Sequence, residues 1–383
     1  ALPICVARVS GVGLYEYMAQ QVFDNQPEEI REFLLRTAIL EEFNAKRCKR
    51  VIGKALGIHA NWSGLMDQLM SRNLFVLPVG EGRDFLRRYH HLFRDFLQSR
   101  MTQERPEETL TITIALGDDY AREKDWERAF LLYKTVRATA KMVELVEKAG
   151  PAMVTAGKIL TLKEWLAALP PDEATSKPSL LSLQAAIMIG MGEVNQGVIL
   201  LNEVIERLEK TDGDIHTLSL SIMRRSFAYR TMGDYEKSQA DSQRVIKLLD
   251  EQPELGLIRA EAMRILGGTY YLQGELKQAL STMKQSLRLF ESYNDQQNIP
   301  KLLFNIGFMN ASMGNYVHAE MMYREALDYW HTGGNLAWAA DLLNNLGVLQ
   351  QQRGDYEKAA ENFERAIEYA RLSNSPQAES LSL

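Results

Sequence analysis

Cysteine is scarce in this chain of 383 residues, in which only Cys5 and Cys48 are present. Two cysteines provide no disulfide framework and their spacing fits no metal site, so we expect the reducing environment of the cytoplasm. Long apolar runs are also lacking. No run approaches the about 18 residues that a membrane-spanning helix needs, and we therefore expect no association with a membrane.

A phosphate-binding loop is missing as well. The nearest approach is Gly53-Lys54, but Ala55 stands where the motif needs Ser or Thr, and Cys48 stands where it needs its first glycine. The histidines form no pair with one another or with a carboxylate at metal-ligand spacing. We therefore predict that the chain is not an enzyme and that it carries no cofactor or metal of its own.

The formal net charge is -6, and it is unevenly distributed. Residues 1–105 hold 15 Lys and Arg against 12 Asp and Glu, whereas the remainder holds 29 (44 − 15) against 38 (50 − 12). An acidic chain is unlike a nucleic-acid-binding protein. One basic cluster nevertheless leaves three alternatives open, which are DNA contact (the least favoured), a solvated helix face, or a surface that docks a neighbouring domain. Its members are Lys46, Arg47, Lys49, Arg50 and Lys54.

The C-terminal half repeats a short motif. Glycines recur every 40 or 41 residues, at Gly192, Gly233, Gly274, Gly314 and Gly354. A small residue lies seven positions before each of them, namely Ala185, Ser226, Gly267, Gly307 and Gly347. A small residue lets two helices approach closely, and a glycine ends the first helix, so each copy is predicted to be a helical hairpin.

These hairpins resemble the tetratricopeptide repeat (TPR), although the family period is about 34 residues. An earlier copy begins near Gly117 and reaches Tyr133. Beyond it, Thr161 is predicted to be the N-cap of a short helix, with Glu164 in a capping-box position. Residues 170–178 contain three prolines and are the predicted hinge.

The N-terminal module has a different pattern. Helices are predicted at residues 15–23, from Pro27, at 46–52 after an Asn44 cap, at 63–71 and at 92–98, with strands at 74–77 and 84–89 around the turn Gly80-Glu81-Gly82. Helices followed by a β-hairpin describe a winged helix. The predicted fold is mainly α: a winged-helix domain (1–104), a helical arm with TPR-like hairpins (105–178) and a TPR sensor (179–383) that forms a right-handed α-solenoid.

Four motifs occur in the order of the region that follows the ATPase core in MalT-type regulators, which are signal-transduction ATPases with numerous domains (STAND). They are Phe33-Leu34-Leu35-Arg36-Thr37-Ala38-Ile39-Leu40, Asn73-Leu74-Phe75, Arg88-Tyr89-His90-His91-Leu92-Phe93 and Trp165-Leu166-Ala167-Ala168-Leu169-Pro170. The resemblance implies that the chain is the winged helix, arm and sensor of a larger switch. ADP or ATP with magnesium would then bind to the nucleotide-binding domain of the parent protein, which oligomerises on activation.

The same resemblance implies that a winged-helix histidine contacts the bound nucleotide. His91 is the favoured candidate, with His90 and Arg88 beside it, because His90 could face Tyr89 and the hairpin. An imidazole at a helix N-terminus adds to a local positive field that favours phosphate. The alternative is a histidine that is hydrogen-bonded within the domain.

In the solenoid, the first helix of each hairpin is expected to line a groove for the inducer. The predicted groove residues are Phe227, Arg230, Arg264, Tyr271, Phe304, Phe308, Asn344 and Gln351. Aromatic rings with two arginines could bind an anionic small molecule or an acidic peptide. The alternatives are that Phe304 and Phe308 belong to the core and that the arginines are solvated.

Two functions are compatible with these patterns. In the first, an inducer, either a small molecule or a protein, binds the sensor and relieves autoinhibition of the parent protein through contacts with its own nucleotide-binding domain. In the second, the repeats form a constitutive scaffold for a partner protein and switch nothing.

Overall fold

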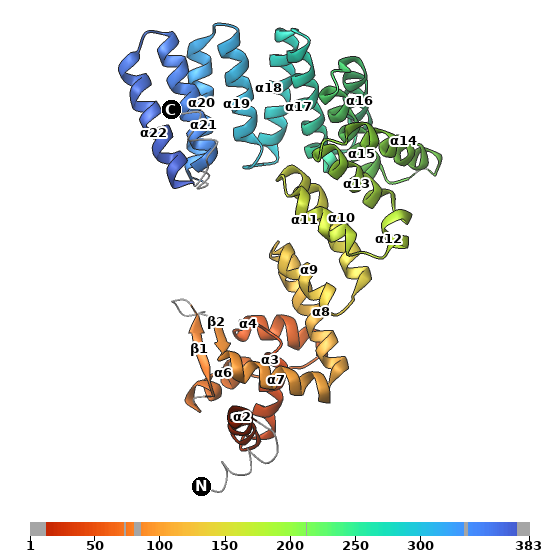
Figure 1. Ribbon diagram of the computed structural model, residues 1–383, viewed down its shortest axis with the longest axis vertical. Coiled ribbons are helices and arrows are strands. Elements are labelled where there is room, and N and C mark those ends of the chain that lie inside the picture. Colours follow the sequence, from red (N-terminus) through yellow and green to blue (C-terminus); the bar gives the residue numbers. More distant parts are fainter. Residues whose placement is uncertain (1–12, 73, 80–85, 212, 333–335, 374–383) are drawn as a thin grey trace. The chain divides into compact units, whose positions relative to one another are not determined.

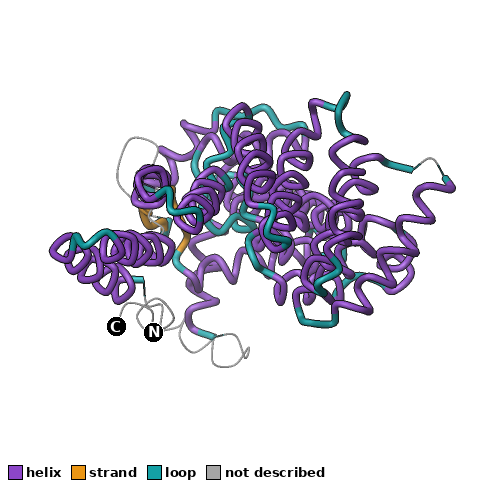
Figure 2. Tube along the Cα trace, turned by 90° about the horizontal axis from the view of Figure 1, so that it is seen from above, coloured by secondary structure: helices purple, strands orange, loops and turns teal. Residues whose placement is uncertain are grey.

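The computed structural model describes residues 13–72, 74–79, 86–211, 213–332 and 336–373. It divides into two compact units, residues 1–174 and 175–383. Helices make up nearly all of the described secondary structure, and the described strands belong to one hairpin in the first unit (Figures 1 and 2). None of the helices in the described part of the chain is long and apolar enough to cross a bilayer.

The winged helix is built from helices and one hairpin, as predicted. Its elements are α2 (Leu14–Asp24), α3 (Glu28–Thr37), α4 (Ala45–Cys48), a π-helical turn η1 (Lys49–Gly53), α5 (Lys54–Leu56), α6 (Trp62–Ser71), β1 (Val76–Val79), β2 (Leu86–Tyr89) and α7 (His91–Glu104). The Asn44 cap is confirmed, since its side chain accepts a hydrogen bond from the Arg47 amide at 2.8 Å. The predicted turn at 80–82 and Asn73 lie outside the described residues.

The hairpin is held to the helices by a buried aromatic cluster. β1 and β2 are antiparallel, with Val76 opposite Tyr89. The ring of Tyr89 lies 4.9 Å from that of Phe43 and 6.0 Å from that of Phe93. Its hydroxyl lies 2.6 Å from the Thr37 hydroxyl, which satisfies both polar groups in the core. Helix α7 extends well beyond the predicted 92–98.

The arm continues the first unit with α8 (Pro106–Arg122), α9 (Trp126–Thr135), α10 (Thr139–Thr155), α11 (Ile159–Ala167) and α12 (Pro171–Ser176). The predicted N-cap at Thr161 is wrong, because Lys158 occupies that position. Gly157 adopts a left-handed conformation (φ +72°) that ends α10, and α11 begins directly afterwards. Thr161 and Glu164 therefore lie inside the helix. The boundary between the two units falls within α12, in the proline-containing segment.

The second unit is a solenoid of five helical hairpins (Figure 1). They are α13 (Pro178–Gly190) with α14 (Val194–Lys210), α15 (Ile215–Thr231) with α16 (Tyr235–Leu248), α17 (Gly256–Leu272) with α18 (Leu276–Ser292), α19 (Ile299–Ser312) with α20 (Tyr316–Thr332), and α21 (Leu336–Gln352) with α22 (Tyr356–Leu372); a 3₁₀ turn η2 (Pro253–Leu255) precedes α17. The repeating glycines have φ between +76° and +89°, which confirms that each ends a first helix.

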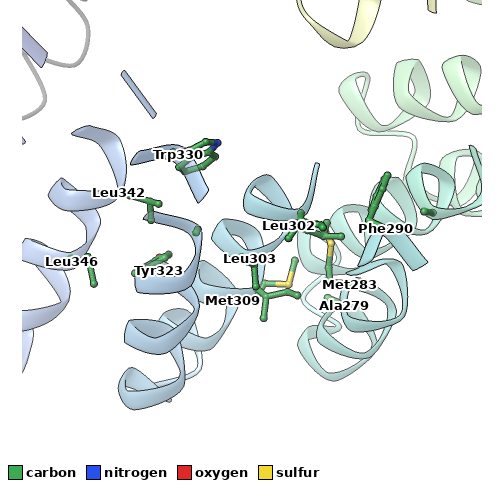
Figure 3. Packing of buried hydrophobic residues seen from close by; sticks show 14 of the residues in the cluster. Ala279, Met283, Phe290, Leu302, Leu303, Met309, Tyr323, Trp330, Leu342 and Leu346 are labelled. Atoms are coloured by element: carbon green, nitrogen blue, oxygen red, sulfur yellow. The ribbon is translucent and has the colours of Figure 1, made fainter. Parts of the chain in front are cut away.

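In α17, α19 and α21 the small residue of the first helix faces a large residue sixteen positions later, whereas Ser226 of α15 faces the small Ser242 and is hydrogen-bonded to it. A Cβ atom on Gly307 would lie 2.6 Å from the ring of Tyr323, and one on Gly347 would lie 2.5 Å from that of Phe363. The absence of a side chain therefore allows the two helices to pack tightly. Between neighbouring hairpins, Leu302 and Leu303 of α19 contribute to a continuous buried cluster with residues of α18, α20 and α21 (Figure 3).

Candidate functional site

The first candidate site is the histidine pair at the end of the hairpin. His90 is the N-cap of α7 and His91 is its first residue. The backbone amide of His90 donates to the carbonyl of Phe75 at 2.8 Å, and the two imidazole centroids are 4.4 Å apart. The backbone of His90 is therefore bound to the hairpin, and the two imidazole rings lie next to each other.

The two histidines differ in exposure. The side chain of His91 is exposed, as is that of Arg88 on β2, whereas His90 is half-buried. Within the described residues, the Nδ1 atom of His90 and the hydroxyl of Tyr15 are buried without a hydrogen-bond partner. Their rings are 6.4 Å apart. His91 and Arg88 can therefore reach a group outside this domain, and His90 retains an unused donor or acceptor beside them.

The basic cluster on α4 and η1 is partly used within the chain. The guanidinium of Arg47 lies 3.2 Å from the Asp119 carboxylate and 2.8 Å from that of Glu123, and Arg50 donates to Asp119 at 2.7 Å. Asp119 and Glu123 belong to α8. For these two arginines the contacts agree with the alternative of a docking surface, here for a helix of the predicted arm. Lys46, Lys49 and Lys54 line a surface hollow next to Trp62.

The second candidate site is one face of the first helices in the solenoid. Counted from the small residue of each repeat, positions −6, −3, +1 and +4 fall on one stripe of a helix. We call this stripe the first-helix face. On four helices it comprises Leu220, Met223, Phe227 and Arg230 (α15); Glu261, Arg264, Gly268 and Tyr271 (α17); Lys301, Phe304, Phe308 and Ala311 (α19); and Asp341, Asn344, Val348 and Gln351 (α21). All of them except Leu220 are half-buried or exposed.

Contacts across this face join α15, α17 and α19. The rings of Tyr271 and Phe308 are 5.8 Å apart, and the Tyr271 hydroxyl lies 3.3 Å from that of Ser312. The Arg230 guanidinium lies 5.1 Å from the centre of the Phe227 ring, within the range of a cation–π interaction. Nη1 of Arg230 also lies against Gly268 of α17, so the structure places these predicted groove residues in one connected row of three helices.

Phe304 has a different role from Phe308. It packs against Tyr323 with ring centroids 5.9 Å apart and belongs to the edge of the core, whereas Phe308 is 44% exposed. The core alternative thus holds for Phe304 and not for Phe308. On α21, Asn344 is half-buried and Gln351 is exposed. Neither residue takes part in the contacts that join α15, α17 and α19.

The charged residues on this face are unequally paired. Arg264 forms a two-pronged ion pair with Glu261, at 2.6 and 2.7 Å. Arg230 and Lys301 form no ion pair within the described residues. Burial lowers the pKa of Arg230 to about 10 and also lowers the pKa of Lys301. Lys301 and Glu261 are not among the groove residues predicted from the sequence, because those were taken from positions −3, +1 and +4. Position −6 follows from the same helical period and would have included both.

No group of three or more His, Cys, Asp and Glu side chains in the described part of the chain is arranged to hold a metal ion. The two candidate sites therefore offer surfaces for recognition: an exposed imidazole and guanidinium at the hairpin, and a row of cations and aromatic rings on the solenoid.

Comparison with known proteins finds separate matches for the winged-helix region and for the repeats. The MalT winged helix domain model matches residues 19–109, and a tetratricopeptide repeat model matches residues 218–292 and 298–371. The MalT transcriptional regulator of Vibrio campbellii is 24% identical over 288 residues, which are 75% of this chain and 31% of that protein. The MalT regulator of Vibrio cholerae is 21% identical over 291 residues, again 75% of this chain and 31% of that protein. The chain thus spans about a third of the length of these curated relatives.

Two solved structures share the fold. A STAND protein with a tetratricopeptide repeat sensor from Pyrococcus horikoshii matches 97% of this chain and 55% of its own, with a TM-score of 0.67 and 17% identity. A Rap protein complexed with competence and sporulation factor matches 72% of this chain and 80% of its own, with a TM-score of 0.53 and 13% identity. The chain thus combines a region that matches the MalT winged helix domain with a region of tetratricopeptide repeats, and over 75% of its length it is similar to MalT regulators.

Proposed function

We propose that this chain is the winged-helix, arm and sensor portion of a cytoplasmic STAND-type switch, in which the repeats bind an inducer and relieve autoinhibition. The observation that carries the proposal is the first-helix face, where Arg230 and Lys301 form no ion pair with any described carboxylate and lie beside solvent-accessible aromatic rings. A solenoid that served only as a spacer would have no need of such groups, because burying an unpaired cation costs free energy.

The histidine pair supplies the other half of the proposed switch. His91 and Arg88 are exposed at the start of α7 and the end of β2, where they could contact a nucleotide held by the nucleotide-binding domain of the same polypeptide. ADP would favour the closed state, and ATP with magnesium would favour an open, oligomerising state. An inducer shifts this equilibrium only if it binds the open state more tightly.

The test mixes the 383-residue chain with the separately produced nucleotide-binding domain of the same polypeptide and measures their affinity with ADP present. We expect a candidate inducer to weaken this association by about tenfold, a typical allosteric coupling. Equal affinity with and without every candidate inducer would favour the alternative, a constitutive scaffold whose repeats bind a partner protein without switching.

A second experiment examines the nucleotide contact. His91→Ala in the full-length protein is expected to release ADP faster and to raise basal activity, because a donor to the phosphates is lost. Leu92→Ala is the matched control, since Leu92 is the adjacent exposed residue of α7 and carries no polar group. Unchanged ADP retention in His91→Ala would refute the assignment of His91 and leave the sensor proposal to the first experiment.

A further inference from the structure

Three cations on the first-helix face come from neighbouring first helices: Arg230 from α15, Arg264 from α17 and Lys301 from α19. The Arg230 guanidinium reaches α17 at Gly268, one helical turn from Arg264. Lys301 occupies on α19 the position that Glu261 occupies on α17, and the charges of Glu261 and Arg264 act on it. Because Glu261 is engaged by Arg264 through two hydrogen bonds, the cluster has a net charge of +2 (three cations and one carboxylate).

The backbone of α17 is shaped around one of these cations. A Cβ atom on Gly268 would lie 2.5 Å from Nη1 of Arg230, too close for an unshifted guanidinium. Glycine in the middle of a helix is destabilising relative to alanine, because it loses more backbone freedom on folding. This glycine lets the Arg230 guanidinium lie against α17, on the side where Arg264 is found.

Within the described residues, the other acidic groups nearby form no ion pair with the cluster. Asp295, which precedes α19, attracts Lys301 from a distance, and its carboxylate accepts hydrogen bonds from the backbone amide and the side chain of Asn298. Burial raises the pKa of Asp341 on α21, and this carboxylate forms no ion pair within the part of the chain that the structure describes. Arg230 and Lys301 thus retain hydrogen-bond donors that lack an anionic acceptor within the described residues.

Aromatic side chains border the same cluster. Phe227 lies beneath the Arg230 guanidinium, and the Tyr271–Phe308 pair spans α17 and α19. Phe227 is 39% exposed and Phe308 44% exposed, so apolar surface is available beside the charge. The cluster is confined to three helices, and the next first helix contributes a carboxylate, Asp341, at position −6. A long acidic peptide would meet that carboxylate, whereas a small molecule would not.

We propose that Arg230, Arg264 and Lys301 form a binding site for a small organic anion, in which a phosphate or carboxylate group contacts the cations and a ring or apolar portion contacts the aromatic residues. This inference rests on the proposed sensor function and names the chemical class of the inducer. The anion supplies the negative charge that the two unpaired cations lack, and the guanidinium groups provide forked donors for it.

The experiment is isothermal titration calorimetry of the 383-residue chain at constant ionic strength, with phenyl phosphate, benzoate and uncharged phenol as probes. We expect saturable binding of at least one of the two anions, and none of phenol. Arg230→Gln and Lys301→Gln should each weaken binding about tenfold or more, since each removes a charge-assisted hydrogen bond. Gly268→Ala should weaken it several-fold by displacing Arg230 while all charges remain.

Arg324→Gln is the matched control, because Arg324 is an exposed arginine on a second helix and pairs with Glu320. It should bind as wild type does. Arg230→Lys keeps the charge but loses the forked donors of the guanidinium, so it should bind with intermediate affinity. Such a result would show that the site tolerates substitution. Circular dichroism verifies the helical content of each variant.

The proposal would be overturned if neither anion bound the wild-type chain. It would also be overturned if Arg230→Gln and Lys301→Gln bound the anion as tightly as the wild-type chain does. Tighter binding of hexaglutamate than of either probe would replace it with an acidic-peptide site. Anion binding without any effect on the association with the nucleotide-binding domain would instead leave the site intact and refute the proposed switch.

Discussion

Asp119 is the buried carboxylate that joins the winged helix to the arm, and its removal is the sharpest stability test of the first unit. Its side chain is 1% exposed and contacts three guanidinium groups: Arg47 and Arg50 from the winged helix, and Arg122 one turn further along α8. We predict that Asp119→Ala destabilises the first unit by roughly 2–3 kcal/mol.

The magnitude follows from the exposure of each partner. Arg50 and Arg122 are 40% and 53% exposed, so each lost contact is worth about 0–1 kcal/mol. Arg47 is only 10% exposed and would be left with Glu123 and the carbonyl of Glu42. Removing one partner of a buried pair costs about 3–5 kcal/mol, and the remaining contact with Glu123 reduces that figure.

The assay is urea unfolding, monitored by tryptophan fluorescence in a background with Trp330 and Trp338 replaced by Phe, so that the signal comes from the first unit. Glu123→Ala is the control, with an expected loss below about 1 kcal/mol because Glu123 is 44% exposed. Adding Arg47→Met to Asp119→Ala should restore part of the stability, with a coupling of about 1–3 kcal/mol. Additive effects, or equal losses for Asp119→Ala and Glu123→Ala, would refute the reasoning.

Two further predictions concern the repeats and acid stability. Gly307→Ala should destabilise the second unit by about 1–3 kcal/mol despite its better helix propensity, because the new methyl group would overlap the buried ring of Tyr323; urea unfolding that shows stabilisation would contradict this close packing. The hydrogen bond from Arg105 lowers the pKa of Glu32 below its ordinary value of 4.5, so its stabilising contribution is complete above that value and is lost as the pH falls through the lowered pKa. Glu32→Gln should therefore cost about 1 kcal/mol at pH 7 and nothing in strong acid, and a difference that persisted unchanged to low pH would argue against this ion pair.

The repeats were predictable because their cause is local. A glycine with positive φ ends each first helix, and a small residue seven positions earlier accepts a side chain from the second helix; both requirements are visible in the amino-acid sequence. The hairpin of the winged helix was predictable for a similar reason, since two short strand-like runs flank the sequence Gly80-Glu81-Gly82, and the two strands pair with Val76 opposite Tyr89.

The remaining features depend on contacts between residues that are distant in the sequence. Arg47 and Asp119 are 72 positions apart, and nothing in the basic pattern of the third helix indicates that a carboxylate on α8 will bury one of its arginines. The start of α11 was misplaced because the helix follows directly from the left-handed Gly157, which overrides the capping preference of Thr161. Capping propensity is a weaker constraint than a backbone turn that is fixed by its neighbours.

The regularity of the solenoid also indicates where its specificity is encoded. At the packing position the four helices α15, α17, α19 and α21 carry Ser226, Gly267, Gly307 and Gly347, which are all small because each must admit a second helix. At positions +4 and −6 of the first-helix face the same helices carry residues with no property in common, which are Arg230, Tyr271, Ala311 and Gln351 at +4 and Leu220, Glu261, Lys301 and Asp341 at −6. Packing therefore constrains the first position and leaves these two free to vary. Ligand recognition is thus expected at the positions whose residues differ from one repeat to the next. In this chain the unpaired cations Arg230 and Lys301 occupy two of those positions.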